Sequence, residues 1–229
     1  AAEVAAAVEL AESGWRPERG DLLVMAVVDE ETGGGDGAIW LTENHPDLVR
    51  CDYLINEGAG SLIPHQGERL YGVCVAEKGV FRFTLRVRGV SGHASMPHMT
   101  DNALPKLAPL IEALATRRPE PDLTEAPLAL MEAIGVSGVE ELRAVNPALA
   151  DFVEPMVSVT FAPTMVAGSE KINVVPSVAE VRVDCRVPPG HGRETAARRM
   201  AEVLAGLDGY EVTWDEEVVG NGSPASSPL

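Results

Sequence analysis

The chain has 229 residues, of which 45% are hydrophobic and 23% charged, a composition typical of a globular protein. A chain of this length buries one sizeable core or two smaller ones, and no apolar run in it is long enough to span a membrane. Its formal net charge of -17 disfavours nucleic acids and anionic lipid surfaces as partners, because both repel an acidic protein.

The cysteines indicate the redox state of the protein. Cys51, Cys74 and Cys185 are odd in number, lack Cys-x-x-Cys spacing, and each lies beside apolar residues. This pattern predicts reduced, mostly buried thiols and a cytoplasmic location.

Residues 1–76 predict part of an α/β domain. An alanine-rich amphipathic helix opens the chain, with Val4 and Val8 on its apolar face, and an apolar strand follows at residues 22–28. A helix that starts near Asp36 and a second apolar strand at residues 53–56 complete a helix, strand, helix, strand order. Because the chain opens without methionine inside a helix and stops without a closing element, we expect it to be the middle of a longer polypeptide.

Carboxylates crowd the loop after the first predicted strand, where Asp29, Glu30 and Glu31 are consecutive and precede a run of glycines. Glu57 follows the second predicted strand in the same way. Two parallel strands place such loops at the carboxyl edge of an open α/β sheet, where ligands bind. Like charges a few ångströms apart repel by about 1 kcal/mol even in water, so a bound cation would offset the crowding.

The adjacent carboxylates are expected to differ in role. Neighbouring side chains on an extended backbone point in opposite directions, so Glu30 and Glu31 are not expected to hold the same ion. One would bind metal while the other faces water or substrate. Carboxylates alone do not select between zinc, magnesium and manganese. The simpler alternative is a solvated turn whose negative charge caps the helix near Asp36.

From Lys78 the pattern changes to that of a second domain, residues 77–218. Its first strand alternates between apolar and polar side chains, which predicts one buried face: Phe81, Phe83, Leu85 and Val87 against Arg82, Thr84, Arg86 and Arg88. There follow a helix at 102–115 that Pro109 would kink, strands at 156–162 and 181–187, a helix at 193–205 and a strand at 210–218. The order β-α-β-β-α-β predicts a ferredoxin-like α+β fold. Residues 117–155, helical at 139–145, are interpreted as an insertion, and residues 219–229 as a return to the first domain.

Two side chains of the second domain are candidates on residue grounds alone. Arg186 alternates onto the polar face of its strand, where a guanidinium can bind a carboxylate with two hydrogen bonds. Arg182 and Asp184 beside it leave an ordinary ion pair as the alternative. His93 lies in a glycine-flanked turn, where a histidine is usually just exposed to solvent. His98 is expected to lie at the surface, and no function is predicted for it. The remaining histidines lie in turn-like contexts and receive no predicted function either: His45, His65 and His191.

The chain resembles the zinc-dependent exopeptidase family that includes aminoacylase, carboxypeptidase G, acetylornithine deacetylase and succinyl-diaminopimelate desuccinylase. The resemblance covers nearly the whole chain and rests on the acidic loops combined with two later segments, Gly89-Val-Ser-Gly-His93-Ala-Ser and Lys171-Ile-Asn173-Val-Val-Pro176. It implies an α/β catalytic domain, partly present here, with an inserted ferredoxin-like lid domain that forms a homodimer.

The resemblance implies a role for each acidic candidate. Glu30 matches the family's general base. Glu31 and Glu57 match ligands of two divalent metal ions, zinc with cobalt or manganese as alternatives. The implied reaction is hydrolysis of an amide or peptide bond in an N-acyl amino acid or a short peptide with a free carboxylate, in which Glu30 takes a proton from a metal-bound water.

The resemblance also implies roles for three residues of the second domain. His93 matches a lid histidine that enters the partner subunit's active site and stabilises the oxyanion. Asn173 and Arg186 match lid residues that bind the amide and the carboxylate of the substrate.

The chain departs from the family at both ends. The family's His-x-Asp motif and bridging Asp would lie upstream of Ala1, and its last metal-binding histidine downstream of Leu229. Two carboxylates are too few for two zinc ions, so the chain by itself is expected to bind metal weakly and to catalyse little. The alternative is a non-catalytic dimerisation or regulatory module that keeps the lid fold. A magnesium phosphoryl-transfer domain would need a glycine-rich phosphate loop, which the sequence lacks.

Overall fold

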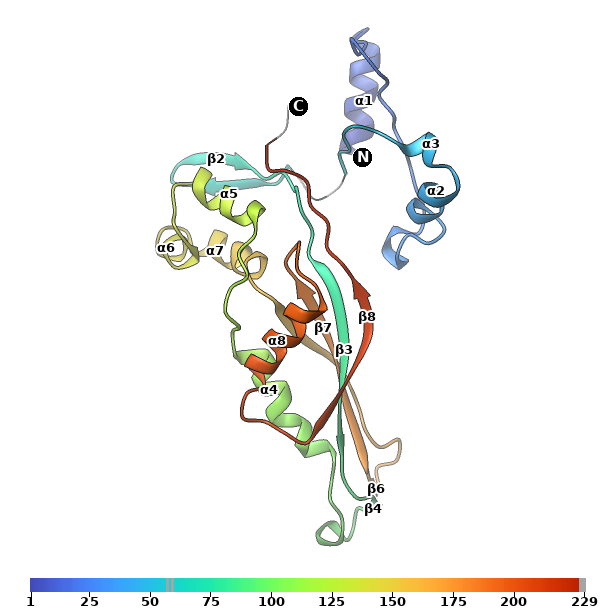
Figure 1. Ribbon diagram of the computed structural model, residues 1–229, viewed down its shortest axis with the longest axis vertical. Helices are drawn as coiled ribbons and strands as arrows, with labels where there is room; N and C mark the ends of the chain where they lie inside the picture. The colour runs from blue at the N-terminus through green and yellow to red at the C-terminus, as the bar shows by residue number, and fades with distance from the viewer. Residues whose placement is uncertain (57, 59, 227–229) are drawn as a thin grey trace. The chain divides into compact units, whose positions relative to one another are not determined.

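The computed structural model describes residues 1–56, 58 and 60–226 (Figure 1). The chain divides into two compact units, Ala1–Glu57 and Gly58–Leu229, which are described separately. The boundary predicted at residue 76 stays a prediction. Among the described residues, no helix is both long enough and apolar enough to cross a membrane.

In the first unit the predicted helices form, whereas the predicted strands do not. The unit contains α1 (Ala2–Glu12), α2 (Ala38–Asn44), α3 (Pro46–Val49) and the 3-10 turn η1 (Glu30–Thr32). Residues 22–28 and 53–56 pair with no strand in the described part of the chain, so that prediction is wrong. A strand needs a neighbour to take up its backbone hydrogen bonds. Without one the apolar side chains stay exposed, as at Val28 (66%) and Ile55 (79%).

The second unit is built on a four-stranded antiparallel sheet (Figure 1). Its strands are β3 (Gly79–Arg88), β5 (Thr160–Ala167), β7 (Val178–Val187) and β8 (Tyr210–Val218), in the spatial order β5-β7-β3-β8. With α4 (Ala108–Thr116) after β3 and α8 (Arg193–Val203) after β7, the elements follow the predicted order β-α-β-β-α-β. We refer to this part of the second unit as the lid.

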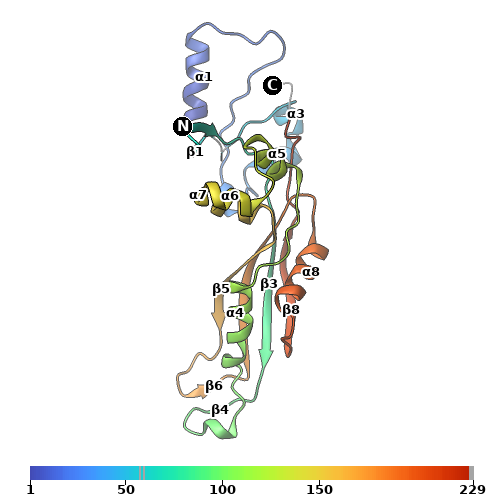
Figure 2. The same ribbon diagram turned by 90° about the vertical axis from the view of Figure 1, so that its left-hand side faces the viewer.

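The apolar face of the lid sheet is covered by α4 and α8, which lie on the same side of it (Figures 1 and 2). The alternation predicted for β3 is confirmed, since Phe81, Phe83, Leu85 and Val87 are at most 2% exposed. The same face of β7 and the inner sides of both helices complete this core: Val181, Val183, Cys185, Leu110, Leu114, Ala196 and Met200. Burying these side chains is the main stabilising contribution to the lid, and it leaves the opposite, charged face of the sheet uncovered by the two helices.

Two prolines shift the predicted boundaries of lid elements. Pro109 lies in the first turn of α4, where its missing N–H costs nothing, so it starts the helix and does not kink it. The residues before it form the 3-10 turn η3 (Leu104–Leu107). The strand predicted at 156–162 forms later, at Thr160–Ala167, because residues around Pro155 form the 3-10 turn η4 (Glu154–Met156).

The segment interpreted as an insertion has its own small core. Its helices α5 (Glu125–Ala133), α6 (Val139–Val145) and α7 (Pro147–Val153) bury Met131, Val136, Leu142, Leu149, Ala150, Val153 and Val157. A hairpin of β1 (Leu62–His65) and β2 (Glu68–Tyr71) packs against this core through Ile63. His65 is the last residue of β1 and is only 6% exposed, so the prediction that it lies in a turn-like context is wrong.

The chain enters and leaves the lid at the same place. The N–H of Glu77 donates to the carbonyl of Asn221 at 3.0 Å, and the N–H of Ser223 donates to the carbonyl of Val75 at 2.7 Å. The segments before β3 and after β8 therefore run side by side.

The cysteines are all free thiols, but they differ in burial. Cys185 is fully buried in the lid core, as predicted. Cys51 and Cys74 are exposed, so the prediction of mostly buried thiols is wrong for these two. Their apolar neighbours are exposed as well, Tyr53 at 50% and Val73 at 77%, and an apolar neighbour in sequence buries a thiol only where a core forms around it.

Candidate functional site

One end of the lid brings two predicted site residues together. There β4 (Gly92–His93) pairs with β6 (Val174–Val175), with His93 opposite Val174, and the N–H of Ala94 donates to the carbonyl of Asn173 at 3.0 Å. His93 and Asn173 are 80 positions apart in sequence but adjacent across this ladder. We call this two-stranded sheet and the loops that flank it the lid tip.

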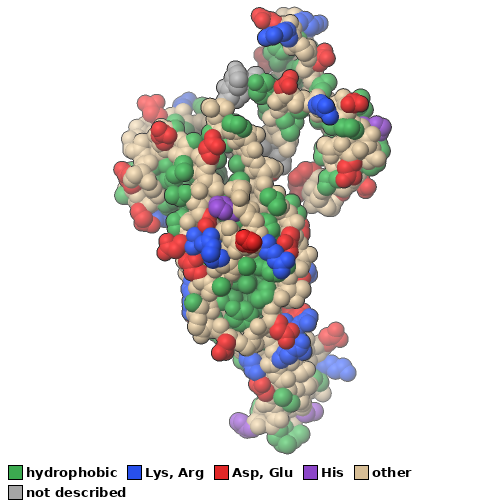
Figure 3. Space-filling view, in the orientation of Figure 1, with side chains coloured by type: hydrophobic (Ala, Val, Ile, Leu, Met, Phe, Trp, Pro, Cys, Tyr) green, Lys and Arg blue, Asp and Glu red, His purple; other side chains and the backbone are tan. Residues whose placement is uncertain are grey.

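Glycines allow the lid tip to fold tightly. A Cβ atom at Gly89 would collide with the carbonyl oxygen of Asp101, and one at Gly92 would collide with the side chain of Thr100. Close packing therefore requires glycine at positions 89 and 92. Histidine side chains appear in Figure 3 over the segment where Figure 1 draws β4 and β6.

The turn at His93 holds the ring by short-range hydrogen bonds. The N–H of Met96 donates to the carbonyl of His93 at 2.9 Å, and the N–H of Ser95 donates to His93 Nδ1 at 3.2 Å. The hydroxyl of Ser95 also lies 2.8 Å from Nδ1. His93 is exposed, so an accessible imidazole is held in a defined place. His98, five residues on, is exposed too, as predicted.

Arg186 lies at the other end of the lid, and its guanidinium is hydrogen-bonded to a carboxylate of the same chain. Its Nε and Nη2 donate to the two oxygens of Asp184 at 2.7 and 3.2 Å, and Arg82 Nε donates to the same carboxylate at 3.0 Å. Burial raises the pKa of Asp184, but the hydrogen bonds from Arg186 and Arg82 outweigh it and hold that pKa below its ordinary value. Arg186 thus forms an ion pair with a carboxylate of its own strand.

Arg186 is too far from the lid tip to share one small substrate with it inside a single chain. Arg186 lies eight positions along β7 from Val178, which is next to the lid tip. At a rise of about 3.3 Å per residue this is roughly 26 Å. The described residues of one chain therefore bring His93 and Asn173 together, but not Arg186 with them.

The acidic loop of the first unit is a tight turn. Asp29 adopts left-handed backbone angles, with φ 67°, and its carboxylate accepts hydrogen bonds from the Thr32 hydroxyl and from the N–H of Asp36, the latter at 3.0 Å. Asp29 therefore closes the loop. Glu30 and Glu31 follow in η1, and both are exposed. Glu57 lies outside the described residues.

The described residues do not form a metal centre. Over residues 1–56, 58 and 60–226, no three His, Cys, Asp or Glu side chains lie close enough together to hold an ion. A zinc ion takes about four ligands, and Glu30 and Glu31 supply at most two carboxylates. These residues alone do not fit a pair of zinc ions.

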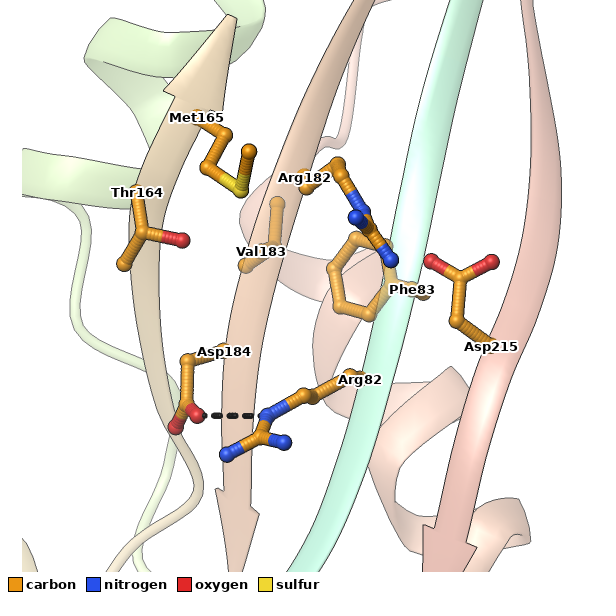
Figure 4. A pocket seen from close by; sticks show the side chains of 8 residues that line it. All are labelled: Arg82, Phe83, Thr164, Met165, Arg182, Val183, Asp184 and Asp215. Carbon is orange, nitrogen blue, oxygen red and sulfur yellow. Dashed lines mark hydrogen bonds and ion pairs between the residues drawn. The ribbon is translucent and has the colours of Figure 1, made fainter. Parts of the chain in front are cut away.

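A pocket of about 310 Å³ opens on the charged face of the lid sheet, between residues that sequence reasoning did not select (Figure 4). Arg82, Thr164, Arg182 and Asp215 line it, one from each strand. The strand pairing shifts register beside it, between Arg82 and Phe83 and between Pro163 and Met165. The alternating pattern places these polar residues on one face, but such bulges leave no signal in a single sequence.

Comparisons with known proteins identify the family. Residues 75–209 match the model of a family described as peptidase dimerisation domain, M20_dimer. The chain is 28% identical over 202 residues to a probable carboxypeptidase S-like 2 of Dictyostelium discoideum, covering 80% of the chain and 38% of that protein. It is 28% identical over 221 residues to a succinyl-diaminopimelate desuccinylase of Xanthobacter autotrophicus, covering 93% of the chain and 47% of that protein.

The chain thus spans less than half the length of these curated relatives. Among solved structures it is similar to an M20 family metallo-carboxypeptidase from Sulfolobus solfataricus, with a TM-score of 0.48 and 19% identity, over 82% of the chain and 48% of that structure. Because the family model matches more than half of its residues, the chain belongs to the peptidase dimerisation domain family, M20_dimer.

Proposed function

We propose that the protein is a hydrolase that cleaves an amide or peptide bond in an N-acyl amino acid or a short peptide with a free carboxylate. The observation that carries the proposal is the lid tip, where His93 lies on β4 and Asn173 directly precedes the partner strand β6, with its carbonyl hydrogen-bonded to the N–H of Ala94. Membership of a peptidase family supports it, as do relatives named carboxypeptidase S-like and succinyl-diaminopimelate desuccinylase.

Each candidate residue has a role in this reaction. Glu30 acts as general base and takes a proton from the attacking water. His93 donates a hydrogen bond to the oxyanion that forms on the amide carbonyl, and such a donor contributes most in the transition state. Asn173 binds the substrate amide, and the Arg186 fork binds the substrate carboxylate.

Glu31 and Glu57 are our candidates for metal ligands, one for each of two divalent ions, with zinc favoured over cobalt or manganese. Two carboxylates cannot complete either coordination shell, so the remaining ligands would come from outside the described residues.

We further propose that the active site is shared between two chains of a homodimer. Arg186 lies roughly 26 Å along β7 from Val178, the residue of that strand next to the lid tip, and a small substrate cannot bridge this length. If the lid tip of one subunit enters the active site of its partner, this distance is no obstacle. The description of the family as a dimerisation domain supports this arrangement.

The lid itself is proposed to be inserted into a catalytic domain of which residues 1–76 and 219–229 are parts. The support is local: the strand-like segments at residues 75–77 and 221–223 are hydrogen-bonded to each other where the chain enters and leaves the lid. A domain inserted into another needs this proximity of its two ends.

The test is hydrolysis of N-acyl amino acids and dipeptides by the full-length protein, loaded with metal, and by two histidine variants of it. His93→Ala should lower kcat about 10²- to 10³-fold, because an oxyanion donor is lost. His98→Ala is the matched control, an exposed histidine of the same loop, and should stay near the wild-type rate. Absence of hydrolysis with every substrate, or equal rates for both variants, would favour the alternative of a non-catalytic dimerisation or regulatory module.

A further inference from the structure

Ser95 contacts His93 through two groups, although the sequence predicted no role for it. Its backbone N–H donates to His93 Nδ1 at 3.2 Å, and its Oγ lies 2.8 Å from the same nitrogen. The turn that makes these contacts possible is itself held at both ends. The N–H of Ala94 donates to the carbonyl of Asn173, and the N–H of Met96 donates to the carbonyl of His93.

These contacts determine which ring nitrogen carries the proton. A backbone N–H is always a donor, so the nitrogen that it approaches must offer a lone pair. A neutral imidazole has one protonated nitrogen and one unprotonated nitrogen, and with Nδ1 as acceptor the proton resides on Nε2. Among the described residues, no protein group hydrogen-bonds to Nε2, so its N–H stays available to a ligand.

We propose that Ser95 is a positioning residue that fixes the Nε2–H tautomer and the orientation of His93, so that Nε2–H is ready to donate to an oxyanion. The proposal rests on the proposed function of His93. The backbone N–H of Ser95 selects the tautomer, and with Nδ1 unprotonated the hydroxyl is the donor in the second contact, which helps to hold the ring in place. The opposite tautomer would place an N–H of the ring against the N–H of Ser95 and would leave an acceptor where the oxyanion needs a donor.

The tautomer is measured without substrate. The 229-residue chain, with ¹⁵N-labelled histidine, is studied by NMR at alkaline pH, where histidine rings are neutral, and the His93 signals are assigned with His93→Gln. We expect Nε2 to be the protonated nitrogen. Ser95→Ala keeps the backbone N–H, so Nε2 should still carry the proton in this variant, although one of the two hydrogen bonds that hold the ring is lost. A wild-type ring protonated on Nδ1 would overturn the inference, whatever the activity.

Ser91 supplies the matched control. Ser91 lies just before β4, and its hydroxyl donates to the carbonyl of Val175 on β6 at 2.9 Å but does not contact His93. In the full-length protein, Ser95→Ala should lower kcat about fivefold with little change in KM. Ser95→Thr should restore kcat, because it returns the hydroxyl. Ser91→Ala should change neither kcat nor KM. Equal losses of kcat in Ser95→Ala and Ser91→Ala would mean that Ser95 only stabilises the turn.

The two proposals fail in different ways. If His93→Ala leaves hydrolysis unchanged, the role proposed for His93 is lost, while the tautomer remains as the NMR experiment finds it. If His93→Ala is inactive but Nδ1 carries the proton in the wild type, the proposed function survives and the role of Ser95 is wrong.

Discussion

The guanidinium of Arg186 donates two hydrogen bonds to the carboxylate of Asp184, at 2.7 and 3.2 Å. The two residues are two positions apart on one strand, so they share a face of the sheet. A substrate carboxylate that bound Arg186 would have to compete with Asp184 for the same pair of donors. Replacing Arg186 therefore distinguishes a substrate-binding role from a purely structural ion pair.

Arg186→Ala should lower kcat/KM about 10- to 100-fold for substrates with a free carboxylate, the worth of charge-assisted hydrogen bonds, and far less for the corresponding amides. The matched control is Arg88→Ala, which removes another ion-paired arginine on the charged face of the sheet, bound to Glu211 at 2.6 Å. Equal losses on acids and amides would make Arg186 a purely structural residue.

Subunits carrying Glu30→Ala and subunits carrying His93→Ala should each be nearly inactive, and a mixture of the two should regain activity after subunit exchange. Random pairing makes about half of the dimers mixed, and each mixed dimer holds one site with both residues intact, so about a quarter of the wild-type sites return. Native mass spectrometry verifies the exchange. Confirmed exchange without recovery would mean that His93 acts within its own chain or not at all.

Glu30→Gln should retain bound metal but lose a factor of about 10² to 10⁴ in turnover, because it removes a base and not a ligand. Glu31→Gln and Glu57→Gln should instead lose metal, since an amide is a weaker ligand than a carboxylate. Elemental analysis of the purified variants decides between the roles. A full metal content in Glu31→Gln would remove Glu31 from the proposed ligands.

Asp122→Asn should destabilise the lid by about 3 kcal/mol, because it breaks a buried ion pair. Asp122 is 7% exposed and accepts from Arg199 Nε and Nη2, both at 2.8 Å. Burial raises the pKa of Asp122, but the hydrogen bonds from Arg199 and Arg198 outweigh it and lower that pKa overall. A lowered folded-state pKa stabilises the protein above the unfolded pKa of about 4, and this stabilisation is lost as pH falls through the folded value.

Urea unfolding at several pH values measures both effects. The wild type should lose stability below about pH 4 more steeply than Asp122→Asn, which lacks this titrating group. Asp151→Asn removes a 70% exposed carboxylate paired with Arg143 and should cost less than about 1 kcal/mol. Equal destabilisation by both substitutions would contradict the importance of burial for Asp122.

Two of the three thiols should react rapidly with an aromatic disulfide reagent in the native protein. Cys51 and Cys74 are exposed, whereas burial raises the pKa of Cys185 to about 12 and leaves almost no thiolate at neutral pH. The third thiol should react only after unfolding in urea. Variants with Ser at Cys51 or Cys74 identify the reactive groups, and rapid reaction of all three in the native state would contradict the packing of Cys185.

Patterns confined to one segment predicted the lid well. The helix at residues 139–145 and the strand at 210–218 form with the predicted limits, and the alternation in β3 correctly named its buried side chains. Periodicity is a local property, and each of these elements finds its partners within the described residues. Where partners are missing, as for residues 22–28, the same kind of pattern predicted a strand that does not form.

The sequence by itself determined which residues have the chemistry for a site, such as His93 in a glycine-flanked turn and the adjacent Glu30 and Glu31. Only the tertiary structure decided which of them meet. The pairing of β4 with β6 brings Asn173 to His93 across 80 positions, and β7 carries Arg186 to the opposite end of the lid. Strand register depends on long-range packing, and a linear pattern does not encode it.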